Sequence, residues 1–114
     1  MRGSVLLGAV LAAPALAADG GAGVPAPERQ QVLVRMVRQD CGSCHGMRLT
    51  GGLGPALTVE RMREWPLESL VATVLHGRPG TPMPGWRSLI DEHDALWIAQ
   101  QLKAGFPAEP GARP

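Results

Sequence analysis

Apolar side chains recur at helical spacing in three segments of the chain, 28–39, 67–76 and 91–103. A repeat of three to four residues places such side chains on one face of a helix, so the pattern predicts three helices. The positions expected to face the core are Val32, Met36 and Gln39, with Leu33 and Val37 beside them; Leu67, Leu70, Val71, Val74 and Leu75; and Ala95, Ile98, Ala99 and Leu102. No segment alternates with the period of a strand for more than a few residues, so the expected fold class is all-α.

Proline and glycine mark the ends of these helices and the stretches between them. Pro27 and Pro66 can occupy first helical positions, and Gly77 is a natural cap for the end of the second helix. The glycine-rich stretch 47–58 and the proline-rich stretch 78–86 are predicted to be loops. The result is a small helical fold with long connections.

The first residues have the pattern of a secretory signal. Arg2 supplies a positive charge, an apolar run follows over 5–13, and a small-x-small sequence ends at Ala17. The apolar run is shorter than the roughly 20 residues of a membrane-spanning helix, which favours cleavage over a retained anchor. We therefore expect a signal peptide at 1–17, with Ala18 as the second choice of cleavage site. The mature chain is then exported to the periplasm without stable membrane insertion.

The rest of the chain is expected to form one domain at 28–106, between a flexible leader at 18–27 and a flexible tail at 107–114. This domain has few large rings for a core, because the 114 residues include three tryptophans, one phenylalanine and no tyrosine. A domain of this size commonly needs a cross-link, a metal or a cofactor for stability. The 11 basic and 10 acidic side chains nearly cancel and form no basic patch, which argues against a nucleic-acid partner.

The two cysteines stand three residues apart in the sequence Cys41-Gly-Ser-Cys44-His45. C-x-x-C-H is the signature of a covalently attached c-type haem. The two thiols can add to the two vinyl groups on one edge of the porphyrin, and the next residue then lies under the iron, where His45 can be the proximal ligand. A disulfide would close a very small loop and add little stability. A thioredoxin-like redox pair would need a βαβ context, and a zinc site would need more ligands than His76 and His93.

The axial ligands follow from the same chemistry. A histidine ligand needs an acceptor for its other ring nitrogen, and the Pro55 carbonyl, ten residues after His45, is expected to supply it. Met83 is the expected second ligand, because Pro82 and Pro84 stiffen its loop and a rigid loop presents a weak thioether at little entropic cost. The other candidates are Met36, Met47, Met62, His76 and His93. His/Met ligation closes both faces of the iron and suits electron transfer, so we expect one haem c and no enzymatic activity.

The attachment motif, Gly54-Pro55-Ala56-Leu57 and the run from Gly77 to Pro84 together resemble a class I monohaem cytochrome c. The resemblance covers about 32–102 and implies three main helices and long loops wrapped around one haem. In that class an aromatic residue of the last helix packs against the first. The expected position is Gln101, and Trp97 lies one turn earlier as the candidate for this contact.

The run 40–57 is similar to the narrower NirC, or cytochrome c-55x, type, which is found with the haem-cd nitrite reductase of denitrifying bacteria. This resemblance implies a periplasmic carrier of single electrons that donates to nitrite reductase in denitrification. The alternative that it implies is an accessory protein in the maturation of, or haem delivery to, nitrite reductase. Both functions need the same haem site, so the site motif does not separate them.

Overall fold

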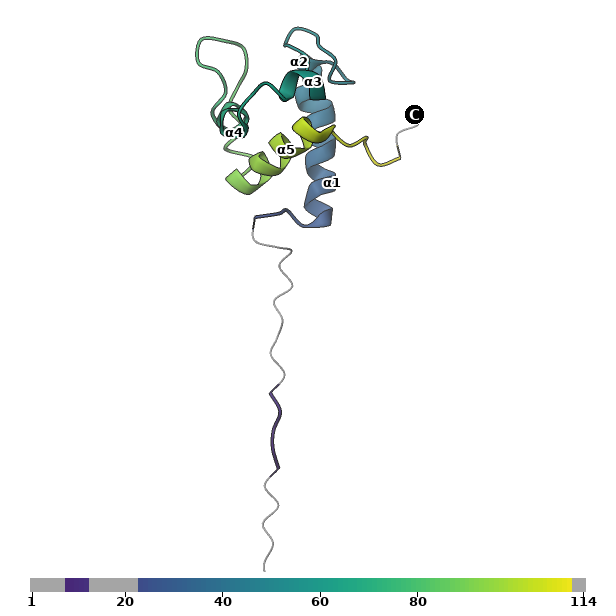
Figure 1. Ribbon diagram of the computed structural model, residues 1–114, viewed down its shortest axis with the longest axis vertical. Coiled ribbons are helices and arrows are strands. Elements are labelled where there is room, and N and C mark those ends of the chain that lie inside the picture. Colours follow the sequence, from purple (N-terminus) through teal and green to yellow (C-terminus); the bar gives the residue numbers. More distant parts are fainter. Residues whose placement is uncertain (1–7, 13–22, 112–114) are drawn as a thin grey trace, which may run out of the picture.

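The computed structural model describes residues 8–12 and 23–111, and within these residues it contains helices and loops but no strand (Figure 1). The elements are α1 (Pro27–Met36), a π-helical turn (Val37–Cys41), α2 (Gly42–His45), α3 (Val59–Met62), α4 (Leu67–His76) and α5 (Glu92–Ala104). The predicted all-α class is confirmed. None of the described helices has the length and apolar character needed to cross a bilayer. The expected cleavage site after Ala17 lies outside the described residues.

The first helical segment runs further than the sequence predicts. The backbone stays helical through the π turn and α2, so the predicted end at residue 39 is wrong and the helical column reaches His45 (Figure 1). In the π turn the Gly42 amide donates to the Val37 carbonyl, five residues back, which accommodates one extra residue. The cysteine motif therefore lies on the end of a helix, where its side chains have fixed directions.

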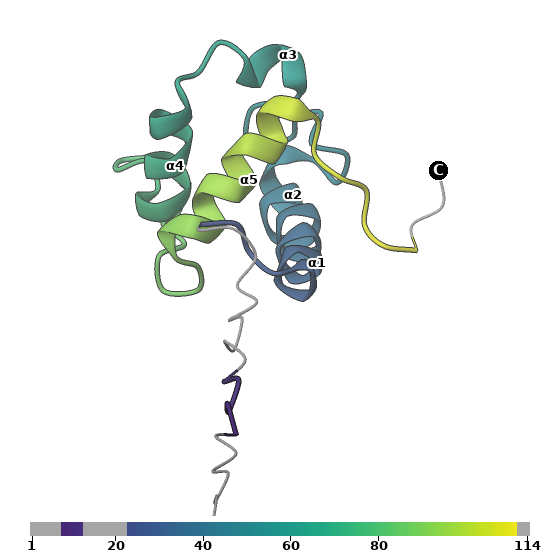
Figure 2. The ribbon, with the colours of Figure 1, turned by 60° about the horizontal axis from the view of Figure 1, so that its bottom comes forward.

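The buried face of α1 lies one position away from the predicted one. Leu33 and Val37 are fully buried and Val34 nearly so, whereas Val32 is 42% exposed and Gln39 is also exposed. Apolar residues occupy two neighbouring stripes on this helix, and only the one with Leu33 and Val37 is fully buried. α5 crosses α1 in both views (Figures 1 and 2). The expectation of a Val32 stripe is wrong because periodicity alone does not say which of two adjacent stripes a neighbour covers.

α4 and α5 lie side by side and supply most of the core (Figure 2). α4 has the bounds that the sequence predicts. α5 begins one residue later than predicted because Asp91 is its N-cap: the Asp94 amide donates to the Asp91 carboxylate at 2.8 Å. The short helix α3 is not predicted, and it buries Met62. The core residues of α4, α5 and their connection are Leu70, Leu75, Ile90, Ala95, Trp97, Ile98, Ala99 and Leu102.

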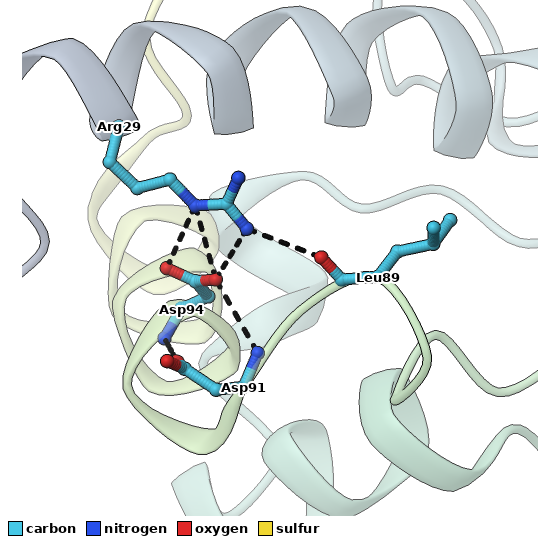
Figure 3. Close-up of polar contacts among 4 residues, drawn as sticks. All are labelled: Arg29, Leu89, Asp91 and Asp94. Carbon is cyan, nitrogen blue, oxygen red and sulfur yellow. Dashed lines mark hydrogen bonds and ion pairs between the residues drawn. The ribbon is translucent and has the colours of Figure 1, made fainter.

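An ion pair joins the first turn of α1 to the first turn of α5 (Figure 3). Arg29 Nη2 lies 2.6 Å from Asp94 Oδ2, and Arg29 Nε lies 3.3 and 3.2 Å from the two carboxylate oxygens. Arg29 Nη2 also donates to the Leu89 carbonyl at 3.2 Å. The hydrogen bond to Asp94 raises the pKa of the Arg29 guanidinium above its usual value. This clamp fixes how the two helices cross.

Aromatic side chains make the second contact between the ends of the domain. Trp97 is buried, and its ring meets that of Phe106 edge to face, with the centroids 6.3 Å apart. The Arg38 guanidinium lies 5.5 Å from the Phe106 ring centroid and donates to the carbonyls of Phe106 and Pro107. Phe106 thus links Trp97 on α5 to Arg38 in the π turn that follows α1. The tail expected to be flexible from residue 107 is held at its first residues, where Glu109 also accepts a hydrogen bond from Gln39.

Candidate cofactor site

The two cysteines lie at the end of the helical column. Cys41 is half-buried in the last position of the π turn, and Cys44 is exposed on α2; both are free thiols. Burial, and next the neighbouring Asp40 carboxylate, raises the pKa of the Cys41 thiol to about 11. The shift favours the protonated thiol over the thiolate.

The His45 imidazole is the buried polar group of the site. The side chain sits in the last position of α2, and the residue is 8% exposed. Its Nδ1 lies 2.6 Å from the Pro55 carbonyl oxygen, which is the acceptor expected from the sequence. A carbonyl oxygen can only accept, so Nδ1 carries a proton, and the tautomer with this bond has its lone pair on Nε2. Nε2 is the atom that can bind a metal, and the hydrogen bond fixes the ring's orientation.

A glycine-rich loop is hydrogen-bonded to the end of α2 and packs against the His45 imidazole. The Gly54 amide donates to the Cys44 carbonyl at 2.7 Å, and the Gly51 amide donates to the His45 carbonyl at 2.8 Å. A β-carbon on Gly54 would lie 2.9 Å from both Nδ1 and Cε1 of His45, which is closer than side-chain contacts allow. Only glycine lets the loop approach closely enough for Pro55 to accept the hydrogen bond. Sequence reasoning identified Pro55 and did not identify this requirement for Gly54.

The loop after α4 carries Met83, which is half-buried. Gly77 ends α4 with φ at +70°, and a β-carbon there would lie 2.5 Å from the Met83 carbonyl. The Arg78 amide donates to that same carbonyl at 3.2 Å, and the Trp86 amide returns the loop to α4 by donating to Val74 at 3.0 Å. The backbone around Met83 is therefore tied at both ends, in addition to being stiffened by its prolines.

The other ligand candidates lie in different surroundings. Met62 is 3% exposed within the core, and Met36 packs against the core from its edge. Met47 is 64% exposed, and His76 and His93 are exposed. Within residues 8–12 and 23–111, no three His, Cys, Asp or Glu side chains gather closely enough to hold a metal ion, so the zinc alternative gains no ligand set there.

A c-type haem fits the residues of this site. The helix end presents two free thiols with a third side chain directly after them, as thioether attachment along one edge of a porphyrin needs. The imidazole already has Nδ1 engaged, which leaves Nε2 for an iron. Several apolar side chains pack at the edge of the core and remain only partly buried; they include Leu57, Trp65, Val74 and Trp86. Cys41, Cys44 and His45 are the residues that would hold the group.

Comparison with known proteins points to the same cofactor. A family model described as cytochrome c oxidase, cbb3-type, subunit III, matches residues 28–102. Cytochrome c55X of Stutzerimonas stutzeri is 57% identical over 86 residues, which are 75% of this chain and 76% of that protein. The solved structure of a c-type cytochrome NirC has 59% sequence identity and a TM-score of 0.70, and the match covers 71% of this chain and 95% of that one.

A more distant relative is a much larger protein. Dihydro-heme d1 dehydrogenase of Pseudomonas aeruginosa is 35% identical over 75 residues. The match covers 66% of this chain and 15% of that protein. The same small fold therefore also occurs as a segment of a longer chain.

Proposed function

Since the chain belongs to the cytochrome c55X family of c-type cytochromes, we propose that it carries single electrons between proteins of the periplasm. As a c-type cytochrome it binds haem c covalently and is not an enzyme. In our proposal the one haem is attached at Cys41 and Cys44 and has His45 and Met83 as axial ligands. The observation that carries the proposal is the His45 ring beside two thiols, with Nδ1 held by Pro55.

Each residue of the site has a distinct task in this proposal. The haem supplies a one-electron couple between ferric and ferrous iron when it is bound. The Pro55 carbonyl accepts the Nδ1 proton of His45, which orients the ring and makes Nε2 a better donor. Hydrogen bonds fix the backbone of the Met83 loop, so its thioether would move little as an iron ligand. His45 and Met83 together would leave no position at the iron for a substrate.

The partner in this proposal is the haem-cd nitrite reductase, which would receive electrons from this protein during denitrification. The support is the likeness of the 40–57 run to the NirC type, together with the 59% identity to a NirC structure. A signal peptide at 1–17 would export this protein to the periplasm. We infer further that the leader is 18–27, the haem domain 28–106 and the tail 107–114. Mass spectrometry of the purified mature protein tests the cleavage site, because the first residue should be Ala18.

A second function is favoured by a specific observation. The similarity to dihydro-heme d1 dehydrogenase spans 66% of this chain at 35% identity, so a related segment is part of an enzyme named for haem d1 chemistry. A separate protein of the same kind could take part in the maturation of nitrite reductase or in haem delivery to it. Redox chemistry would then serve cofactor assembly instead of nitrite reduction.

Rapid mixing distinguishes the two functions. The reduced protein is mixed without oxygen with oxidised haem-cd nitrite reductase, and oxidation of the cytochrome is followed by absorbance. The shuttle proposal predicts electron transfer that depends weakly on salt, because the one lysine is half-buried and donates to the Met62 carbonyl, and the mature chain would carry balanced charge. No transfer to nitrite reductase contradicts the shuttle function and favours the maturation role.

A surface variant makes the same assay more specific. Met47 follows the attachment motif and is 64% exposed, so it is expected to lie in the apolar contact with the partner. Met47→Glu should lower the second-order rate about fivefold or more, which corresponds to about 1 kcal/mol. Val32→Glu makes the same chemical change at a 42% exposed position of α1 and serves as the matched control. Equal rates for both variants, together with a steep salt dependence, would contradict this contact.

A further inference from the structure

One side-chain stack connects the two ends of α4. Trp65 lies just before α4, and Arg78 lies just after Gly77, which ends it. The carbon of the Arg78 guanidinium is 5.8 Å from the centroid of the Trp65 ring. A guanidinium within about 6 Å of an indole face makes a cation–π contact. The stack therefore joins the start of the Met83 loop to a residue at the other end of α4.

The Trp65 platform is itself anchored to α5. Lys103, in the last turn of α5, donates from Nζ to the carbonyl of Met62 at 2.9 Å and to the carbonyl of Trp65. One ammonium thus holds the chain that leaves α3, at the residue whose ring lies under Arg78. Trp65 is half-buried and packs against the core, so its ring has little freedom to move away.

The backbone of Arg78 is tied to Met83. Its amide donates to the Met83 carbonyl at 3.2 Å. Its carbonyl accepts from the Thr81 amide at 3.0 Å and from Thr81 Oγ1 at 2.7 Å. Thr81 Oγ1 also accepts from the Met83 amide at 3.3 Å. Arg78 therefore reaches Trp65 through its side chain and Met83 through its main chain.

We propose that Trp65 and Arg78 are a positioning pair that keeps the Met83 loop closed, so that an outside ligand replaces Met83 less readily. The inference rests on the proposed function, because it takes Met83 to be an axial ligand. Neither residue touches the iron in this proposal. An opened loop must break the stack as well as the hydrogen bonds around Arg78, and the stack therefore adds to the stability of the closed state alone.

The experiment measures imidazole binding to the ferric holoprotein by absorbance titration. Trp65→Leu and Arg78→Gln should each tighten imidazole binding about two- to fivefold, the range expected for a partly exposed cation–π contact. The double variant should bind no more tightly than either single variant, because both substitutions remove the same contact. Trp65→Phe keeps an aromatic face under Arg78 and should bind imidazole almost as weakly as the wild-type protein. Arg61→Gln removes an exposed arginine on α3 and should change nothing.

Hydrogen exchange provides a second readout, which does not depend on Met83 ligation. The Arg78 amide, which donates to Met83, should exchange two- to fivefold faster in both single variants, while amides in the middle of α5 keep their wild-type rates. A general loss of stability would instead speed exchange in α5 as well. Effects of the two substitutions that multiply in the double variant would overturn the proposal.

An effect of Arg78→Gln without one of Trp65→Leu would also overturn it, since Arg78 would then act through another group, such as a haem propionate. Failure of the proposed function looks different. In that case Met83→Ala leaves the ferric spectrum unchanged, whereas the coupling between Trp65 and Arg78 is still read from hydrogen exchange.

Discussion

The His45 ring is oriented by its hydrogen bond to the Pro55 carbonyl, and it fits there because residue 54 is glycine. Gly54 has an ordinary backbone angle, so alanine there would introduce no backbone strain, only a β-carbon 2.9 Å from the imidazole. Gly54→Ala should displace the ring from Pro55 and lower the free energy of unfolding of the holoprotein by about 1–3 kcal/mol. Denaturant titration measures the loss, and the ferric absorption spectrum reports the shifted ligand.

Gly111→Ala is the control for this substitution. Gly111 lies in the tail, has φ at +81° and has no atom within 4 Å of its would-be β-carbon, so alanine there does not touch the site. Its spectrum should equal that of the wild-type protein. A normal spectrum for Gly54→Ala as well would contradict the close contact with His45.

Attachment is a second prediction at the residue scale. Mature protein should retain one haem per chain after extraction with acidified acetone, because thioether bonds to Cys41 and Cys44 survive it. Mass spectrometry measures the added mass, and Cys41→Ala and Cys44→Ala should each lower the yield of the haem-bearing protein. Haem that passes entirely into the organic phase would contradict covalent attachment.

The sequence predicted the chemistry of the site better than its shape. Cys41, Cys44 and His45 are recognisable because their spacing has one well-defined chemical use. The need for glycine at position 54 is not recognisable, because it depends on a contact between segments that only the fold brings together. For the same reason the sequence does not reveal that Lys103 donates to the Met62 carbonyl at the end of α3.

The ion pair between α1 and α5 leads to a prediction at the scale of elements. The Asp94 side chain is 8% exposed and accepts from Arg29, so removing the guanidinium leaves a nearly buried carboxylate with only backbone partners. Arg29→Met should therefore cost about 1–3 kcal/mol in the free energy of unfolding. Arg87→Met is the matched control, because the Arg87–Glu92 pair is 3.6 Å long and exposed at both side chains. Its cost should stay below about 0.5 kcal/mol, and equal losses would contradict the clamp.

Lys103→Met tests how α3 is held in place. The substitution keeps an apolar stem but removes the donor to the carbonyls of Met62 and Trp65. The expected loss in the free energy of unfolding is about 1–3 kcal/mol, because those acceptors lie partly buried. Thermal unfolding checks the value, and Arg61→Met on α3 is the control. No loss for Lys103→Met would mean that water replaces the ammonium at little cost.

Elements with a strong periodic pattern and defined ends were predicted well. α4 matches to the residue, because proline precedes it and glycine ends it. The first helix was predicted too short, because a π turn leaves no signature in hydrophobic spacing. α3 was missed because four residues are too few to establish a period.

At the scale of the whole molecule, the haem is expected to complete the core. The largest fully buried side chains are Leu33, Ile98 and Val37, and both Trp65 and Trp86 remain partly buried. The apoprotein should therefore lose most of its helical circular dichroism and its cooperative thermal transition, whereas the holoprotein keeps both. The apoprotein can be produced without the haem-attachment machinery. An apoprotein with a sharp unfolding transition would contradict a core that depends on haem.

The near-infrared absorption of the ferric holoprotein tests the central claim of a His/Met-ligated electron carrier most directly. The account predicts the weak sulfur-to-iron charge-transfer band in the wild-type protein, its loss in Met83→Ala, and its retention in Met62→Leu and His76→Ala. Met83→Ala should also open the iron to carbon monoxide in the ferrous state. A wild-type protein that lacks the band and binds carbon monoxide readily, or a band that survives Met83→Ala, would contradict the account.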